Sequence, residues 1–390
     1  TGLGQGASLA AASGLDDWST ALPHLLVRTE FEAWTGMTGA GSHNYLTVYR
    51  QPERDDFLKS ARVAPPFYDR TARAWIVVEP DRCRELLSVP GLLPAPALEH
   101  YRNMPSGMGE AFASVAFAFE HIPLSMYGER HAEARRRAST WIAARHQAIH
   151  AWAADSLPGH LARFAEPGQA ELMTAVIKPL VRGLFATLVA VDLPDHLALD
   201  DVSLVFDKSI GMSRRVRLEA DMAALEAHLR DRMGPGASDD EVGMRLGLLV
   251  VGKDALVGTL AESLANLFTE HAGQPLSSIV FPKLPQRTAV PFVERIAATA
   301  LQAGGLDLAE GDRVRVVLQT YGHGPATEHH RFFGAGAHAC LGRPLSVELW
   351  GAIAARLTTL STRVEVSRYE LPLDSYVFNV PSLFEVDISR

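Results

Sequence analysis

The feature that most limits how this chain can fold is an apolar segment that is too continuous to lie on a surface. Residues 240–270 follow helical periodicity, and the stretch 246–260 is apolar nearly all round. A helix that is apolar on every face needs neighbours on every side, so this pattern predicts a helix in the middle of a large molecule. Arg245 and Lys253 keep the apolar run well short of the roughly 20 residues that a membrane helix needs.

The rest of the chain predicts a mainly α protein with a small β region, an α+β fold. Residues 74–78 are rich in β-branched and aromatic side chains and predict a strand, which Glu79 and Pro80 end by starting a helix. Residues 129–268 read as mainly helical, 291–318 as short strands, 342–360 as a helix and the tail as strands. We expect a flexible tail over residues 1–20 and a single domain over 21–390.

Charge and cysteine usage exclude several classes of protein. The net charge of -8 argues against a nucleic-acid partner, because such proteins usually carry a basic surplus. Two cysteines do not make a disulfide framework, and the Gly/Ala-rich start lacks the form of a signal peptide. These features predict a cytoplasmic protein without a membrane partner, and the Arg-, Ala- and Gly-rich composition is typical of a GC-rich bacterial genome.

The most informative short segment is the loop 333–342, Phe-Gly-Ala-Gly-Ala-His-Ala-Cys-Leu-Gly. Its glycines let the backbone lie flat against a ligand and adopt positive φ. The loop presents Cys340 just ahead of a predicted helix, whose unpaired N–H groups and dipole stabilise a thiolate. Donors to the sulfur also tune the potential of an iron bound there.

This segment resembles the haem-binding signature of the cytochrome P450 family, Phe-x-x-Gly-x-His-x-Cys-x-Gly. Every specified position is matched, by Phe333, Gly336, His338, Cys340 and Gly342. The resemblance implies the cytochrome P450 fold and haem b (iron protoporphyrin IX) as cofactor. It implies Cys340 as the axial iron ligand, with the imidazole of His338 near a haem propionate and the ring of Phe333 shielding the sulfur.

Further segments resemble the same family in the same order, from about Trp75 to beyond Cys340. His131 and Arg135 stand four residues apart, so they share one helix face, as do the propionate ligands of the family's helix C. Arg295 stands where the family places a third propionate ligand, on the strand after helix K. The resemblance therefore implies four side chains around the propionates.

The buried helix departs from the family at its catalytic centre. Gly252 and Asp254 match the family's Ala-Gly-x-(Asp/Glu)-Thr, in which the glycine leaves room for dioxygen and the acid and threonine guide protons. Ala255 stands at the threonine position and has no hydroxyl to donate. Thr259 lies one turn further along and is a candidate replacement.

The family's helix K is also altered. Arg287 stands at the Arg of Glu-x-x-Arg, but Leu284 replaces the Glu, and Pro282 and Pro285 disfavour a regular helix. The meander loop before the cysteine loop is short, and Glu348 lies one position earlier than the family's usual acid. The family's Glu–Arg ion pair and the meander loop that docks on it are thus altered together, which avoids leaving a buried charge unpaired.

These features predict a haem-thiolate oxidoreductase, either a monooxygenase or an atypical enzyme, that oxidises or rearranges a small natural-product intermediate in bacterial specialised metabolism. The missing threonine favours peroxide-driven, coupling, cyclisation or rearrangement chemistry. Electrons would come from a ferredoxin, for which Arg136, Arg137 and Arg343 offer a basic face or merely a solvated patch, or from hydrogen peroxide. The aromatic segment 99–121, which contains Met104 and Met108, is expected to line the substrate pocket.

Two alternatives belong to other classes. A non-catalytic P450-like accessory protein that stabilises a glycosyltransferase or another biosynthetic partner is favoured by the altered helix K and disfavoured by the complete cysteine loop. His146 and His150 have the spacing of a zinc-binding H-E-x-x-H helix, but Gln147 replaces its catalytic Glu and no third ligand is apparent. We therefore expect an exposed helix face there rather than a metal site.

Overall fold

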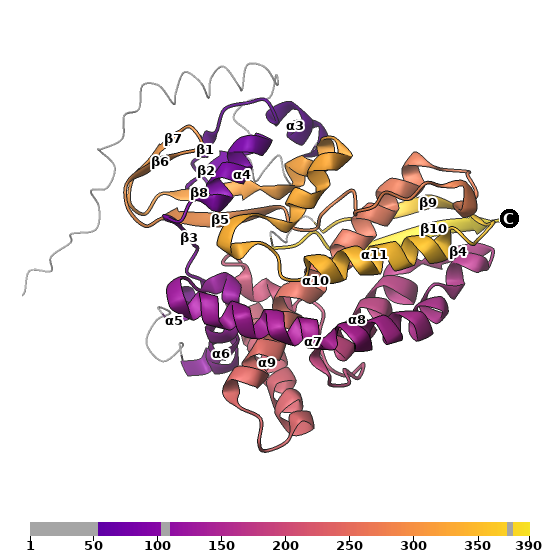
Figure 1. Cartoon of the computed structure of the whole chain (residues 1–390), viewed down its shortest axis with the longest axis horizontal. Helices are drawn as coiled ribbons and strands as arrows, with labels where there is room; N and C mark the ends of the chain where they lie inside the picture. The colour runs from indigo at the N-terminus through magenta and orange to yellow at the C-terminus, as the bar shows by residue number, and fades with distance from the viewer. Residues whose placement is uncertain (1–53, 103–109, 373–376) are drawn as a thin grey trace, which may run out of the picture. The chain divides into compact units, whose positions relative to one another are not determined.

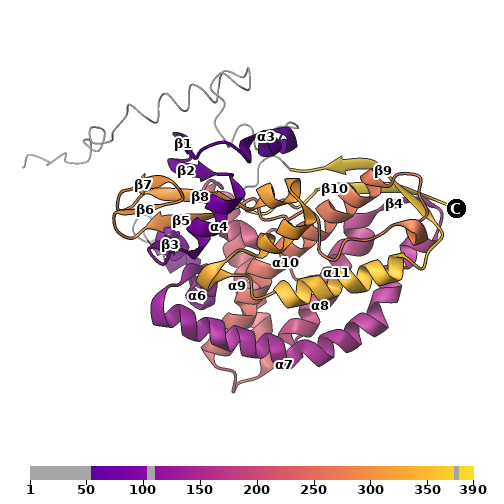
Figure 2. The same ribbon diagram turned by 45° about the horizontal axis from the view of Figure 1, so that its top comes forward.

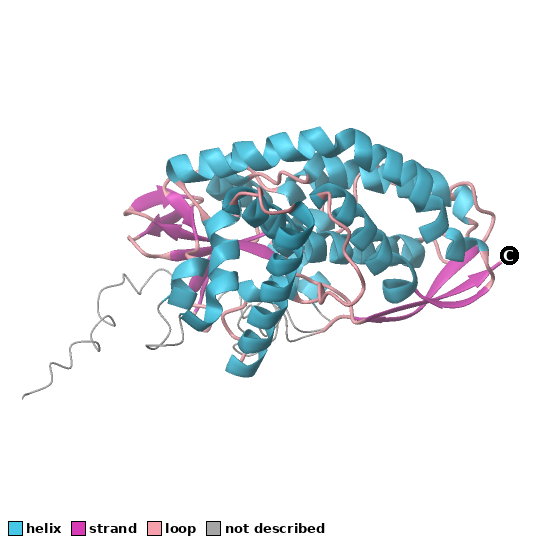
Figure 3. Ribbon diagram, turned by 90° about the horizontal axis from the view of Figure 1, so that it is seen from below, coloured by secondary structure: helices cyan, strands magenta, loops and turns pink. Residues whose placement is uncertain are grey.

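The computed structural model describes residues 54–102, 110–372 and 377–390, so the expected tail over residues 1–20 lies outside the described residues. Helices dominate the described chain, as the sequence predicts (Figure 3). The α-helices are α3 (Arg54–Ala61), α4 (Pro80–Ser88), α5 (Ala97–Arg102), α6 (Ala113–His121), α7 (Gly128–His160), α8 (Lys178–Val189), α9 (Met212–Met233), α10 (Asp239–Glu270) and α11 (Arg343–Leu357). The shorter helical turns are η1 (Glu110–Phe112), η2 (Pro123–Ser125), η3 (Ala162–Ala165), η4 (Met173–Ile177), η5 (Val202–Phe206), η6 (Leu276–Ser278), η7 (Leu318–His323), η8 (Ala326–Phe333) and η9 (Gly336–His338).

The strands within the described residues form three separate sheets. The largest has five strands in the order β1-β2-β8-β5-β3, in which only β2 and β8 run parallel among the described pairs. A three-stranded sheet has the order β4-β10-β9, and β6 and β7 form a hairpin. The strands are β1 (Phe67–Asp69), β2 (Ala74–Val77), β3 (Leu92–Pro94), β4 (Gly168–Glu171), β5 (Phe292–Ala297), β6 (Leu301–Ala303), β7 (Leu306–Leu308), β8 (Arg313–Val317), β9 (Arg363–Glu370) and β10 (Leu383–Ser389). The five-stranded and three-stranded sheets lie on opposite sides of the helices (Figure 1).

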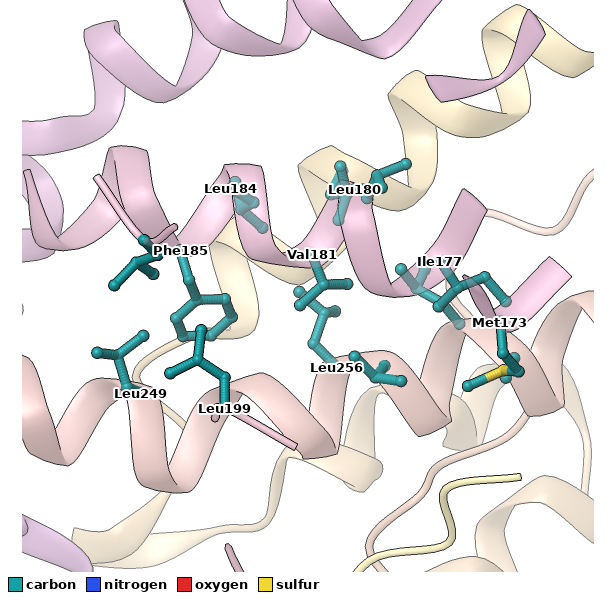
Figure 4. Packing of buried hydrophobic residues seen from close by; sticks show 14 of the residues in the cluster. Met173, Ile177, Leu180, Val181, Leu184, Phe185, Leu199, Leu249 and Leu256 are labelled. Carbon is teal, nitrogen blue, oxygen red and sulfur yellow. The ribbon is translucent and has the colours of Figure 1, made fainter. Parts of the chain in front are cut away.

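The long helix α10 is the central element of the main hydrophobic core. Its N-terminus is fixed by a capping box, in which Ser238 and Glu241 exchange side-chain and backbone hydrogen bonds. Helices α6, α8 and α9 pack along it, and Figure 4 shows Val181 and Phe185 of α8 facing Leu249 and Leu256 of α10. The expectation of a helix buried on nearly all sides is confirmed, and this burial fixes the helix against which a site can be built.

The elements around the cysteine loop follow from local sequence. α4 begins at Pro80 because the Glu79 carboxylate accepts from the N–H groups of Asp81 and Arg82. α11 starts directly after the loop, and α7 runs along one side of the molecule's helical part (Figure 2). Residues 280–291 contain no helix, which agrees with the effect expected of Pro282 and Pro285. None of the described helices combines the length and apolarity that a membrane span requires.

Candidate functional site

The cysteine loop is held in one conformation by its glycines and by a backbone hydrogen bond. The N–H of Cys340 donates to the carbonyl of Phe333 at 2.7 Å, which closes the loop between η8 and α11. Gly336 has φ of +67°, and a Cβ there would lie 2.6 Å from the carbonyl oxygen of Leu87 at the end of α4. Both conditions require glycine, so the match of Gly336 to the signature has a local physical cause.

The thiol of Cys340 is accessible although it lies deep in the protein. Its side chain is exposed, yet burial by the surrounding protein raises the pKa of the thiol. The N–H groups of Gly342 and Arg343, at the N-terminus of α11, donate to the sulfur and lower that pKa. The sulfur accepts two backbone hydrogen bonds and is exposed on its remaining side. A cation that binds there would therefore favour the thiolate form.

The middle of α10 carries one partly exposed stripe on a helix that is otherwise buried. The residues of this stripe are Leu248, Val251, Gly252, Ala255 and Thr259. Their spacings of three and four residues place them on one face, and their exposure shows that this face borders accessible space. The hydroxyl of Thr259 accepts a hydrogen bond from the N–H of Ala289 at 3.1 Å, which ties it to the segment before β5.

Asp254 does not lie on this stripe. Its buried carboxylate accepts from the Ser203 hydroxyl at 2.6 Å and lies 2.5 Å from the ammonium group of Lys253. It therefore faces η5, about 100° around the helix from Ala255. Gly252 lies at the stripe's edge, where a Cβ would meet the ring of Phe185 at 2.8 Å, so close packing with α8 favours glycine at this position. The sequence did not indicate Ser203 as a partner of Asp254.

Two histidines and two arginines come together beside the cysteine loop. The rings of His131, at the start of α7, and His338, in η9, have centroids 4.1 Å apart. Burial, followed by the neighbouring His131, Arg295 and Arg135, lowers the pKa of His338 to about 4. The structure thus brings together all four residues that the resemblance assigns to the propionates.

This cluster has excess positive charge and no carboxylate of its own. Arg295 is 4% exposed, and burial lowers its pKa to about 10. Its Nη1 donates to the backbone carbonyl of Glu294 at 3.0 Å, and no carboxylate within the described ranges is paired with it. The Nε2 atom of His131 is likewise buried without a hydrogen-bond partner. Buried cations and donors are costly unless an anion or acceptor meets them, so this cluster is suited to bind carboxylates.

The aromatic segment expected to line a pocket is instead largely part of the core. Tyr101, Phe112 and Phe119 are each at most 2% exposed and pack on one another with ring centroids 5.6 and 5.7 Å apart. The expectation that these three line the pocket is therefore wrong, because rings packed on each other have no free face for a ligand. Met104 and Met108 lie outside the described residues.

The basic face is smaller than the sequence suggests. The Arg137 guanidinium lies 2.8 Å from the Asp240 carboxylate, so its charge is compensated within the protein. Arg136 and Arg343 are exposed, and Arg343 lies over the ring of Phe333. His146 is paired with a carboxylate, that of Glu348 at 3.1 Å, on the exposed side between α7 and α11.

No family model and no curated protein matches this chain, whereas many solved structures do. The structure of CalO2 superposes with a TM-score of 0.72 at 14% identity, covering 87% of this chain and 97% of that one. The P450 heme domain of Tepidiphilus thermophilus gives 0.68 at 17% identity, with coverage of 87% and 94%. P450BioI in complex with a hexadec-9Z-enoic acid ligated acyl carrier protein gives 0.68 at 14%, with coverage of 88% and 100%. The chain therefore has the cytochrome P450 fold, mainly α with a small β region.

Proposed function

We propose that this chain is a haem-thiolate oxidoreductase of the cytochrome P450 family, with haem b as cofactor and Cys340 as the residue whose thiolate would hold the iron. The observation that carries the proposal is the pairing of an open thiol that has two N–H donors with a buried cationic cluster that lacks a carboxylate. Haem would supply a partner for each feature, because its iron binds a thiolate and its two propionates bind cationic side chains. The residues present therefore fit the group.

The chain's own residues have distinct parts in this proposal. Gly342 and Arg343 donate to the sulfur and hold its charge, while His131, Arg135, Arg295 and His338 orient the cofactor through its carboxylates. The haem supplies the redox chemistry when it is bound. The partly exposed stripe of α10 borders accessible space and would contribute to the substrate pocket.

The stripe also bears on the class of reaction. Ala255 has no hydroxyl, and the Asp254 carboxylate is engaged by Ser203 and Lys253, so neither supplies a proton to the stripe. We therefore propose a reaction that needs little proton delivery by the protein, such as peroxide-driven oxidation, coupling, cyclisation or rearrangement of a small natural-product intermediate. Electrons would come from a ferredoxin or from hydrogen peroxide.

The test is the spectrum of the purified protein after haem reconstitution. The ferrous carbon monoxide complex should show the red-shifted Soret band of thiolate ligation, and Cys340→Ser should abolish it. Cys83→Ser is the matched control, because Cys83 is buried on α4 and its thiol faces the carbonyl of Val77 at 3.2 Å. A Cys340→Ser variant that keeps the thiolate band would refute the ligand assignment. A protein that binds no haem would favour the accessory role in stabilising a biosynthetic partner.

A further inference from the structure

Arg287 lies in the non-helical segment before β5, and its guanidinium joins elements that are distant in sequence. Both Nε and Nη2 donate to Oδ1 of Asn266 on α10, at 3.1 and 2.8 Å. Nη1 donates to the carbonyl oxygen of Gly322 in η7 at 3.3 Å. The guanidinium thus ties the central helix to the segment that leads to the cysteine loop.

Two further side chains complete this arrangement. A ring nitrogen of His323, in η7, lies 3.1 Å from Nη1 of Arg287. The carboxylate of Asp55, in α3, lies 3.6 Å from Nη2 of Arg287 and 3.8 Å from Nε2 of His323. Gln286 accepts from Nδ2 of Asn266 at 3.1 Å, which turns Oδ1 of that amide toward the arginine. We call Arg287, Asn266, Asp55 and His323 the Arg287 anchor.

The segment held by the anchor continues directly into the cysteine loop. Arg62, just after α3, donates to the carbonyl of Thr320 in η7 and lies 2.8 Å from the carboxylate of Glu328 in η8. Helix η8 then ends at Phe333, whose carbonyl accepts from the N–H of Cys340. A displacement of η7 or η8 would therefore also displace Cys340.

We propose that Asn266 takes the place of the glutamate that Leu284 replaces, and that Arg287 with Asn266 is a positioning pair that fixes the cysteine loop. Asn266 supplies the directly bonded acceptor, and two carboxylates compensate the charge of Arg287. Asp55 lies 3.6 Å from Nη2, and the charge of Arg287 also acts on the buried Glu262, one turn earlier on α10, against the burial that raises the pKa of that carboxyl. The anchor itself is a property of the fold, and its effect on the haem rests on the proposed function.

The experiment compares Arg287→Met, Asn266→Ala and the conservative Asn266→Asp with an exposed-arginine control, Arg217→Met on α9. Hydrogen–deuterium exchange is measured over residues 318–340 and over β9 and β10 as an internal reference. Arg287→Met and Asn266→Ala should speed exchange over 318–340 by roughly tenfold or more, because loss of the charged hydrogen bonds costs on the order of one to two powers of ten in local opening. Asn266→Asp keeps the acceptor and should retain protection, as should Arg217→Met.

The second readout is the share of the ferrous carbon monoxide complex with thiolate rather than thiol ligation. That share should fall for Arg287→Met and Asn266→Ala and be restored by Asn266→Asp, an effect that general destabilisation would not reverse. Unchanged exchange over residues 318–340 in Asn266→Ala would overturn the proposal. This variant decides the question even when Arg287→Met does not fold. If the parent protein binds no haem, the proposed function fails while the exchange data still decide the anchor.

Discussion

The imidazole rings of His131 and His338 face each other with centroids 4.1 Å apart, one at the start of α7 and the other in the cysteine loop. Burial lowers the pKa of both rings, which favours their neutral forms at pH 7. Neutral rings are able to donate a hydrogen bond outward while the charges of Arg135 and Arg295 remain unneutralised beside them. The pair therefore marks a preformed site for carboxylates.

Removing the two arginines of this site should weaken haem binding without unfolding the protein. Each charge-assisted contact contributes about 1.5–3 kcal/mol, so Arg135→Ala combined with Arg295→Ala should weaken binding at least roughly a hundredfold. Haem titration of the apoprotein measures this. Arg130→Ala with Arg217→Ala removes two exposed arginines and serves as the control, and equal affinity in the two double variants would place the propionates elsewhere.

His323 should make the protein less stable in acid. Its side chain is 3% exposed, and burial, followed by the charge of Arg287, lowers its pKa to about 4. In the unfolded chain a histidine titrates near 6.5, so below that pH the unfolded state binds more protons and the folded state loses stability. This loss grows from about pH 6.5 down to pH 4, by at most about 1.4 kcal/mol per pH unit, and then levels off.

Urea unfolding at several pH values between 7.5 and 4.5 tests this expectation. His323→Gln keeps a polar side chain that does not titrate, so its unfolding free energy should fall less steeply with acid than that of the parent. Other buried histidines contribute equally to the pH dependence of the unfolding free energy in both proteins, so their effect cancels when the variant is compared with the parent. Parallel pH dependences would show that His323 is not the titrating group.

Gly258 on α10 should not tolerate alanine. A Cβ there would lie 2.0 Å from the backbone oxygen of Asn379 and 2.6 Å from Cβ of Ala289, and backbone atoms cannot move aside. Overpacking of this kind costs about 1–3 kcal/mol, more than the roughly 1 kcal/mol that alanine gains in helix propensity. Gly351→Ala on α11, where a Cβ meets nothing within 4 Å, should instead stabilise. Thermal denaturation of the two variants should thus shift in opposite directions.

The sequence predicted those features whose signals are local. The cysteine loop, the start of α4 at Pro80 and the burial of α10 follow from residues close together in the chain, so pattern and capping rules suffice. Strand β4 was missed within a region read as helical, because Gly-Gln-Ala-Glu has no β-branched or aromatic residue and is a strand through its pairing with β10. Its strand state is set by tertiary pairing, which periodicity does not contain.

Side-chain partners distant in sequence were equally beyond prediction. Ser203 binds Asp254 across 51 positions, and Asn266 binds Arg287 across 21. Serine and asparagine are common polar residues without a distinctive spacing, so neither stands out before the chain is folded. The sequence indicates the charged residue of each pair, Asp254 and Arg287. It does not indicate the neutral partner that fixes the orientation of the charged group.

Ala255→Thr should fail to improve coupling of electron use to product formation. The stripe of α10 is partly exposed, so a threonine fits at this position. Its hydroxyl would still lack the acid that normally supplies it, because the Asp254 carboxylate is turned about 100° away and is bound by Ser203 and Lys253. The new donor therefore adds a polar group to the stripe but no route for protons.

Product formed per reducing equivalent is the quantity to compare, with a ferredoxin system and with fatty-acid and aromatic probes. We expect slow, poorly coupled turnover by the parent, with Ala255→Thr no better than the isosteric control Ala255→Val. Adding Ser203→Ala to Ala255→Thr removes one of the two groups that hold Asp254 and leaves Lys253 in place, so any rise in coupling should be confined to that double variant. Tightly coupled hydroxylation by the parent, or a clear gain from Ala255→Thr alone, would show that protons reach this stripe by a path independent of Asp254. In that case the preference for chemistry with little proton delivery would be wrong.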